Sequence, residues 1–392
     1  FLEVMMMMMM RSLLSLLLHH LLSLITASSF HTTPAAAFSP NTNPCKFSRV
    51  KRMASESPCS WHPGTELLRL DPSTLCKEGE GTPQLAKDEE YASAIVKVWR
   101  DEIDTRTSNG GGSVASPFMY KCKIDGSSLY GHIYRPSPPS NNASSPVKRS
   151  LPGIVLFHTG AGPQDIFLRW KADSLVNERE VFGDEGCVVL IADIIGDASG
   201  WAWHDREKYE AVRKSILVPD ANGERKKLTG RVQAAIDAIA SQPGVDAERI
   251  GAMGFCLGGH PILELARMKH PSVGAMATFH GVFDGVRKLS SVEGGNSVEG
   301  MDDVVSAAAS KCNVLVCTGE EDPFIPVEDL DAAMEMFNDL GYQSEMMKFE
   351  RTRHGFTNPA QDCNPNEAFA YSEEACTKAW SAALSLLKSM AR

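Results

Sequence analysis

Several common signatures are missing from this chain of 392 residues. None of its ten cysteines forms a C-x-x-C pair, and no histidine cluster accompanies them, so we expect no structural zinc site. Cysteines spread this thinly along a long chain indicate mostly buried thiols rather than a disulfide framework. There is also no G-x-G-x-x-G segment, which argues against dinucleotide binding.

An excess of positive charge is missing as well. The chain carries 39 basic and 49 acidic side chains, a net charge of −10, which argues against nucleic acid or an anionic membrane surface as the main partner. Outside the N-terminus no apolar run reaches about 18 residues, so no membrane span is expected. With 43% hydrophobic and 22% charged residues, the chain can bury a sizeable core, which excludes a disordered or fibrous protein.

Residues 1–53 are predicted to be a targeting presequence, because no acidic residue occurs between Val4 and Ser55. Residues 5–37 have the features of a signal peptide: Arg11, a short apolar run over residues 13–25, and small residues ending at Ala37. The run is too short to span a bilayer.

Residues 38–53 are basic and rich in hydroxyl groups, like a transit peptide. A signal-like part followed by Phe38 and a transit-like part resembles the two-part plastid presequences of algae with secondary plastids. We therefore expect import into a plastid, with a plain secretory signal or a mitochondrial leader as the alternatives. Residues 54–112 are predicted as a helical extension, with a helix over residues 85–103, and a glycine-rich linker.

From residue 113 to residue 392 the pattern is that of one α/β domain. A hairpin over residues 121–134, with Asp125-Gly126 at its turn, comes first. Six apolar segments follow, each typical of a parallel strand buried on both faces: 153–157, 188–192, 250–253, 275–279, 313–317 and 344–349. Helices are expected over residues 164–177, 231–241, 257–268, 327–340 and 367–390. This order predicts a doubly wound, mostly parallel sheet with helices on both faces.

Residues 254–259, Gly-Phe-Cys-Leu-Gly-Gly, follow a predicted strand and open a predicted helix. This is the pattern of a nucleophile elbow with Cys256 in the place of the more usual serine. Gly254 and Gly258 suit the tight turn, in which a Cβ would clash. The helix N-terminus favours a thiolate, and the N–H of Leu257 would face a developing oxyanion. The alternative is a buried structural cysteine in a glycine-rich turn.

An acid and a histidine follow at the positions that this fold uses for its catalytic partners. Asp322 lies five residues past Cys317, and His354 lies five residues past Phe349, so both follow predicted strands. The carboxyl ends of parallel strands share one edge of the sheet, so both are expected near Cys256. Alone, Asp322 is a turn residue and His354 a loop histidine, but the order nucleophile, acid, histidine favours a triad. No G-x-S-x-G segment offers a competing serine.

These motifs resemble the dienelactone hydrolase family, α/β-hydrolases with a Cys-Asp-His triad and a G-x-C-x-G-G elbow. The resemblance covers about residues 115–392 and includes Leu-Phe-His-Thr-Gly-Ala-Gly at residues 156–162. It implies that Cys256, Asp322 and His354 are catalytic, and that a second oxyanion donor is the backbone N–H near Gly160. It also implies a small-molecule ester or lactone substrate and no metal or organic cofactor.

One position departs from the family pattern. Well-studied members have a glutamate immediately before the second oxyanion donor, thought to hold the nucleophile until substrate arrives, whereas this chain has Thr159 there. Without that carboxylate nothing obvious competes with His354 for the proton of Cys256. A standing thiolate–imidazolium pair at neutral pH is therefore expected.

Further residues, Thr159 among them, are candidates for the wall of the pocket. His158 and His280 end predicted strands on the catalytic edge, and buried structural roles are the alternative for both. Trp201 and Trp203 lie in an insertion where this fold often places a lid, with aromatic packing under a long loop as the alternative. His260, inside the elbow helix, is expected to be structural.

The predicted function is hydrolysis of small carboxylic esters or lactones through a thioacyl intermediate on Cys256. One alternative is a non-catalytic thiol module that senses oxidants or binds a ligand through the same cysteine. The acid and histidine favour the enzyme, because a sensing thiol needs no orienting carboxylate. A thioesterase or a peptide-bond hydrolase is a further alternative within the hydrolases.

Overall fold

The computed structural model describes residues 91, 93–103, 112–137, 150–196, 206–289, 312–364 and 366–390. The presequence predicted over residues 1–53, most of the extension over residues 54–112, and Trp201 and Trp203 lie outside the described residues, so these stay predictions. Within the described ranges no helix is long and apolar enough to cross a membrane.

The centre of the domain is an eight-stranded sheet with the order β1-β2-β4-β3-β5-β6-β7-β8. The strands are β1 (Ser113–Lys121), β2 (Ser128–Pro136), β3 (Leu151–Phe157), β4 (Val188–Ala192), β5 (Val245–Phe255), β6 (Val273–Phe279), β7 (Asn313–Gly319) and β8 (Gln343–Phe349). β1 and β2 pair antiparallel, β2 pairs antiparallel with β4, and all other pairs are parallel. The predicted α/β-hydrolase fold, with a mostly parallel doubly wound sheet, is confirmed.

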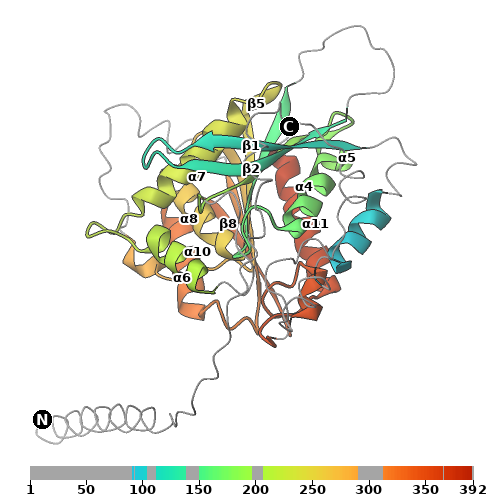
Figure 1. Ribbon diagram of the computed structural model, residues 1–392. Coiled ribbons are helices and arrows are strands. Elements are labelled where there is room, and N and C mark those ends of the chain that lie inside the picture. The colour runs from blue at the N-terminus through green and yellow to red at the C-terminus, as the bar shows by residue number, and fades with distance from the viewer. Residues whose placement is uncertain are drawn as a thin grey trace, which may run out of the picture. The chain divides into compact units, whose positions relative to one another are not determined.

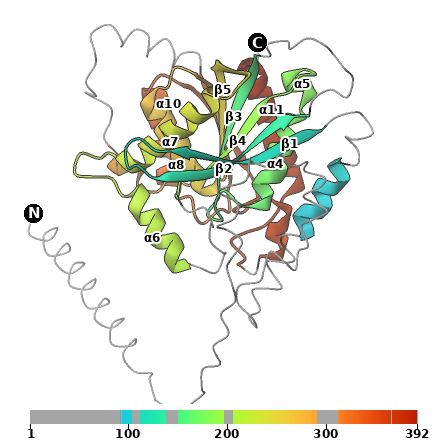
Figure 2. The same ribbon diagram turned by 45° about the horizontal axis from the view of Figure 1, so that its top comes forward.

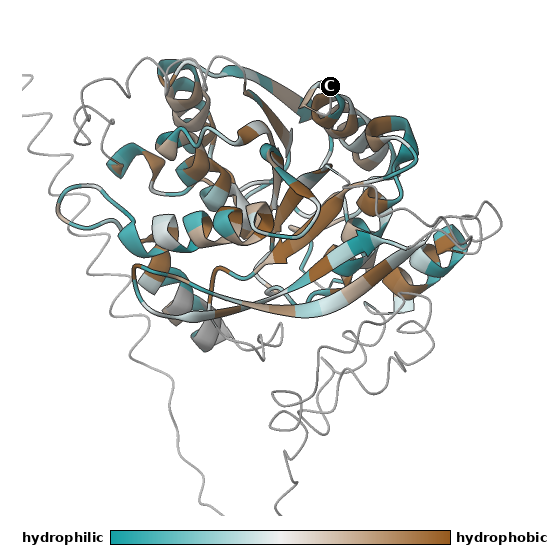
Figure 3. Ribbon diagram, turned by 90° about the horizontal axis from the view of Figure 1, so that it is seen from above, coloured by the Kyte–Doolittle hydropathy of each residue, from teal (hydrophilic) through white to brown (hydrophobic). Residues whose placement is uncertain are grey.

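Helices cover both faces of this sheet (Figure 1). One face carries α4 (Ile166–Val176), α5 (Arg179–Phe182), α11 (Glu373–Met390) and the helix through residues 93–103, which share one core cluster. The other carries α7 (Lys226–Ala240), α8 (Gly259–Met268) and α10 (Val327–Asp339), which share a second cluster, and α6 (Arg206–Leu217) packs against α7. Figure 3 shows the central strands as the most hydrophobic part of the ribbon.

One detail of the predicted strands was wrong. The segment over residues 344–349 was expected to be buried on both faces, but β8 is the last strand of the sheet, and Gln343, Glu345 and Lys348 are exposed along it. An edge strand has one paired neighbour, so polar side chains are tolerated there. The first hairpin strand ends at Lys121, because residues 122–127 form the turn, in which the Asp125 carboxylate accepts from the Ser127 N–H at 3.0 Å.

The winding of the chain reverses at β3, which lies between β4 and β5. Ligands of doubly wound sheets bind outside the carboxyl ends of the strands at such a switch point. Here Phe157 at the end of β3 is paired with Gly254 near the end of β5. The segments that follow these two strands are the loop with Gly160 and the elbow with Cys256.

The helix through residues 93–103 is built into the core of this domain. Trp99 is fully buried, and its Nε1 donates to Oδ2 of Asp173 on α4 at 2.6 Å. The hydroxyl of Ser113 at the start of β1 donates to the other oxygen of the same carboxylate. Figure 2 shows this helix lying along the side of the domain that carries α4 and α11.

Candidate active site

The turn from β5 into α8 has the strained geometry of a nucleophile elbow. Cys256 has φ 54°, in the left-handed region that side chains rarely adopt, and begins a single 3-10 turn, Cys256–Gly258. A Cβ on Gly254 would lie 2.1 Å from the carbonyl oxygen of Gly258, and a Cβ on Gly258 would lie 2.6 Å from that of Phe157. Only glycine fits at both positions, so these glycines allow the turn that presents the sulfur at the sheet edge.

His354 and Asp322 form a buried pair at the same edge. His354 Nδ1 lies 2.7 Å from Asp322 Oδ2, and both side chains are almost fully buried. The other carboxylate oxygen, Oδ1, accepts from the Phe324 N–H at 2.9 Å, which fixes the rotation of the carboxylate. The backbone of His354 is held by hydrogen bonds with residues 368 and 370. The imidazole is therefore fixed in both position and tautomer, with Nδ1–H donating to the acid.

Three groups converge on the sulfur of Cys256. Burial by itself raises the pKa of the thiol. The charge and hydrogen bond of His354, together with the N–H groups of Gly160 and Leu257, have the opposite effect and hold the pKa below its usual range. The structure thus places two backbone donors and one imidazole around the same sulfur atom.

Comparison with known proteins agrees with this geometry. The dienelactone hydrolase family matches residues 142–391, well over half of the chain. The chain belongs to the dienelactone hydrolase family. It is 29% identical over 172 residues to the uncharacterized protein K02A2.1 of Caenorhabditis elegans, an alignment that covers 44% of this chain and 98% of that protein.

Two solved structures share the fold of this dienelactone hydrolase family member. The structure named m3DLH is 26% identical, with a TM-score of 0.54, and the match covers 71% of this chain and 98% of the other. The dienelactone hydrolase-like promiscuous phosphotriesterase P91 from metagenomic libraries is 24% identical, with a TM-score of 0.52, over 70% of this chain and 98% of the other. The family match makes the chain a hydrolase of a family that acts on small molecules.

The imidazole of His354 favours its charged form. Burial lowers the pKa of His354, but the Cys256 thiolate and the Asp322 carboxylate outweigh burial and raise the pKa to about 10. The charged imidazole of His354 and the ionised thiol of Cys256 together form one ion pair. The standing thiolate–imidazolium pair expected from the sequence is the state that these interactions favour.

We predict that iodoacetamide labels Cys256 at a rate that is already flat near neutral pH. The lowered thiol pKa keeps the reactive thiolate populated as the pH falls toward neutrality, so raising the pH adds little more of it. The measurement is the labelling rate by mass spectrometry across pH, with His354→Ala as the matched control, whose rate should rise at higher pH. A wild-type rate that still climbs through a single step near ~8.5, the value of a free cysteine, would contradict the pair.

Thr159 takes part in the loop that carries the Gly160 donor. Its hydroxyl accepts from the Ala161 N–H at 3.1 Å and donates to Asp165 Oδ2 at 3.3 Å. A buried carboxylate therefore does stand behind this position, although it comes from Asp165 at the start of α4. The sequence did not single out Asp165, because nothing in its neighbourhood marks it as more than a helix cap.

His158 directly follows β3 and is turned into the fold. It is fully buried, its Nε2 accepts from the Ile194 N–H at 3.3 Å, and its Nδ1 lies 2.6 Å from the Thr159 carbonyl oxygen. Both ring nitrogens are thus used, and the bond from Ile194 fastens the segment after β3 to the segment after β4. These contacts favour the structural interpretation of His158 over a place in the pocket wall.

His280 lies behind the triad. It is buried, its Nε2 lies 3.0 Å from the Thr357 hydroxyl, and its ring meets the ring of His354 edge to face at 4.9 Å between centroids. Burial and the nearby charge of His354 lower the pKa of His280, so a neutral imidazole packs against the charged one. His280 therefore contacts the triad histidine, while its burial argues against the substrate contact considered for it.

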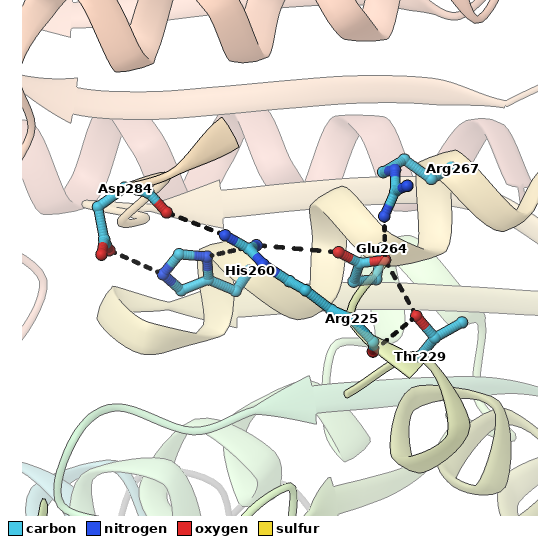
Figure 4. A network of polar contacts seen from close by, with 6 residues as sticks. All are labelled: Arg225, Thr229, His260, Glu264, Arg267 and Asp284. Atoms are coloured by element: carbon cyan, nitrogen blue, oxygen red, sulfur yellow. Dashed lines mark hydrogen bonds and ion pairs between the residues drawn. The ribbon is translucent and has the colours of Figure 1, made fainter. Parts of the chain in front are cut away.

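His260 belongs to a polar network on the elbow helix (Figure 4). Its Nδ1 lies 3.1 Å from the Arg225 guanidinium, and its Nε2 lies 3.0 Å from Asp284 Oδ1. Burial lowers the pKa of His260 to about 4, so it is neutral at physiological pH. Glu264 on the same helix lies 2.7 Å from Arg267. The structural role expected for His260 agrees with these contacts.

Two phenylalanines that the sequence analysis missed flank the triad histidine. The Phe324 ring lies 5.0 Å and the Phe369 ring 5.2 Å from the ring of His354, both edge to face. Phe324 is 39% exposed, which is unusual for so large an apolar side chain. Its position two residues after Asp322 is the signal by which the sequence could have identified it.

The remaining cysteines are not part of this site. In the described part of the chain six cysteines besides Cys256 are present, of which Cys122, Cys187, Cys312, Cys317 and Cys376 are buried and Cys363 is partly exposed. Within the same ranges, no three His, Cys, Asp or Glu side chains are grouped to hold a metal ion.

Proposed function

We propose that this chain hydrolyses small carboxylic esters or lactones by covalent catalysis at Cys256. The observation that carries the proposal is the convergence of the Gly160 and Leu257 N–H groups and His354 on one sulfur atom. N–H groups that point at an ionised sulfur are also placed to donate to the oxygen of a carbonyl group whose carbon this sulfur attacks. Acyl transfer needs this arrangement of nucleophile, oxyanion donors and acid–base group.

The first half-reaction forms a thioester. The thiolate of Cys256 attacks the carbonyl carbon, and the carbonyl electron pair moves onto oxygen, which the N–H groups of Gly160 and Leu257 stabilise. When the oxyanion collapses, the carbon–oxygen bond to the alcohol breaks, and the imidazolium of His354 gives its proton to the leaving alkoxide. In a lactone that alcohol stays attached to the acyl group.

The second half-reaction releases the acid. His354, now neutral, takes a proton from water, and the hydroxide attacks the thioester carbon in the same oxyanion site. The carbon–sulfur bond then breaks, which restores the thiolate beside a protonated histidine. Asp322 holds Nδ1–H throughout, so that Nε2 faces the reacting atoms.

The aromatic side chains beside His354 indicate which leaving group the site favours. Because His354 protonates the alcohol, the side chains beside it lie on the leaving-group side of the scissile bond. Phe324 and Phe369 make that side apolar, which favours an aryl or alkyl alcohol over a charged one. This observation supports esters and lactones over substrates with a charged leaving group.

We predict that the full chain cleaves p-nitrophenyl acetate and a simple six-membered lactone, and that acid quenching during turnover traps an acetyl group on Cys256. A thioester to this sulfur is the intermediate that the arrangement of donors requires. Mass spectrometry of the quenched protein identifies the acylated residue. Turnover without acylation of Cys256 would contradict the mechanism, and a thiol that is oxidised by peroxide but cleaves no ester would favour the sensing module.

A further inference from the structure

Tyr91 connects two loops of the candidate active site. Its hydroxyl lies 3.0 Å from Asp165 Oδ1 and 3.2 Å from Asp165 Oδ2, and it accepts from Asn358 Nδ2 at 2.7 Å. Asp165 follows the Gly160 loop, and Asn358 follows His354 by four residues. Tyr91 itself precedes residues 142–391, the part of the chain that matches the family. One hydroxyl group therefore joins three segments that are far apart in the sequence.

The Asp165 carboxylate organises the loop that follows β3 and carries Gly160, residues 158–165, which we call the oxyanion loop. Oδ1 caps α4 by accepting from the Phe167 N–H at 3.1 Å, and Oδ2 accepts from the Thr159 hydroxyl at 3.3 Å. That hydroxyl in turn accepts from the Ala161 N–H at 3.1 Å. The Thr159 hydroxyl thus links the Ala161 N–H to this carboxylate. Gly160 lies between these two residues, and its N–H faces the sulfur of Cys256.

Asn358 organises the loop that carries His354, residues 350–358, which we call the histidine loop. Its N–H donates to the Gly355 carbonyl oxygen at 2.9 Å, and its side-chain oxygen accepts from the Ala360 N–H at 3.0 Å. These bonds close the turn that directly follows His354. The remaining side-chain group of Asn358, its amide nitrogen, donates to Tyr91.

We propose that Tyr91 is a positioning residue that holds the oxyanion loop and the histidine loop at a fixed separation on either side of Cys256. The inference rests on the proposed function, because both loops carry groups that act there. The Tyr91 hydroxyl bonds to Asp165 and to Asn358, and its effect passes through these two residues. Small displacements of catalytic groups from their productive geometry lower rates strongly, so a link of this kind acts on the chemical step.

The chemistry of the link suits this role. A tyrosine hydroxyl has one proton to donate and lone pairs with which to accept, so it satisfies an anionic acceptor and an amide donor at once. Burial raises the pKa of Asp165 to about 6, while the groups that face it, the Phe167 N–H, Tyr91, Thr159 and the charge of Arg169, oppose this. At neutral pH the carboxylate is ionised and accepts from both hydroxyls. Bonds to an ionised acceptor are the stronger kind.

The test compares Tyr91→Phe with Tyr342→Phe in the full chain. Tyr342 is a matched control, because its hydroxyl also makes a buried hydrogen bond, to the Ala266 carbonyl oxygen at 2.9 Å, but on the opposite helix layer. We expect Tyr91→Phe to lower kcat for p-nitrophenyl acetate by roughly 5- to 20-fold with little change in KM, and Tyr342→Phe to change neither. Circular dichroism shows that both variants are folded.

A second readout does not depend on ester hydrolysis. Because the Gly160 N–H lowers the pKa of Cys256, a loosened oxyanion loop should move the pH midpoint of iodoacetamide labelling upward in Tyr91→Phe and not in Tyr342→Phe. A shifted midpoint in a chain that cleaves no ester would support the link while refuting the proposed function. A midpoint and a kcat for Tyr91→Phe equal to those of Tyr342→Phe would overturn the inference.

Asn358→Ala removes the other side of the link and completes a cycle. If the two residues act through one hydroxyl, the double variant Tyr91→Phe/Asn358→Ala should lose less kcat than the product of the two single losses. Multiplied losses would show that Tyr91 and Asn358 act separately, and would overturn the proposed link between the loops.

Discussion

We expect Cys256→Ala to lower kcat/KM for ester hydrolysis by a factor of about 10⁴ or more, with the fold intact. The side chain supplies the nucleophile, and no serine follows the same elbow pattern in the sequence. The turn itself depends on Gly254 and Gly258, which the substitution leaves in place. His354→Ala should cost about as much, because members of a triad act as a unit.

The measurements are initial rates with p-nitrophenyl acetate and circular dichroism for the fold. Cys363→Ala is the matched control, since Cys363 is the other described thiol that is not fully buried, and it follows a different segment of the chain. This control should keep wild-type activity. Full activity in Cys256→Ala would refute the proposed mechanism, whereas equal losses in both variants would indicate a general effect of removing a thiol.

The central strands and the three candidate catalytic residues could be predicted from the sequence because their signals are local. β3 and β4 are short runs of apolar residues, and burial on both faces leaves no room for another pattern. The elbow depends on close backbone approaches that only glycine permits, so its spacing is visible in the sequence. Asp322 and His354 follow strands, and the parallel topology alone brings such positions to one edge.

What the sequence did not reveal depends on contacts between distant segments. β8 is an edge strand because of the order of all eight strands in the sheet. The six residues of the predicted strand 344–349 do not by themselves predict that place. Tyr91 and Asn358 are 267 positions apart, and neither lies in a recognisable motif. His158 directly follows β3, and its ring turns inward to bond the backbone of Ile194. Side-chain direction at a strand end is set by the neighbouring loop, which composition does not specify.

The second large effect is expected for Asp322→Asn, which should lower kcat by a factor on the order of 10³–10⁴. The structure shows why the isosteric amide is a poor substitute. The Phe324 N–H donates to Oδ1, so the oxygen of the new side chain is held on that side. The amide nitrogen must then face Nδ1 of His354, where it donates instead of accepting.

An amide donor at Nδ1 selects the wrong tautomer of His354. With Nδ1 as the acceptor, the proton of the neutral imidazole moves to Nε2. Nε2 can then no longer accept a proton from water. The pKa of His354 should fall from about 10, because the Asp322 carboxylate is one of the groups that raise it. The thiolate of Cys256 loses its charged partner as a result, and its pKa should rise toward that of a free cysteine.

Asp322→Asn is therefore expected to change two measurements together. Ester turnover should fall, and iodoacetamide labelling of Cys256, flat near neutrality in the wild type, should climb with pH toward the ordinary thiol range near ~8.5. Asp329→Asn is the matched control, because Asp329 also pairs with a cation, Arg287 at 3.2 Å, but lies on α10, where its partner is outside the triad. It should leave both measurements unchanged. If Asp322→Asn lost turnover while its labelling profile stayed flat, the carboxylate would be acting on substrate rather than on His354, and the assigned role of Asp322 would be wrong.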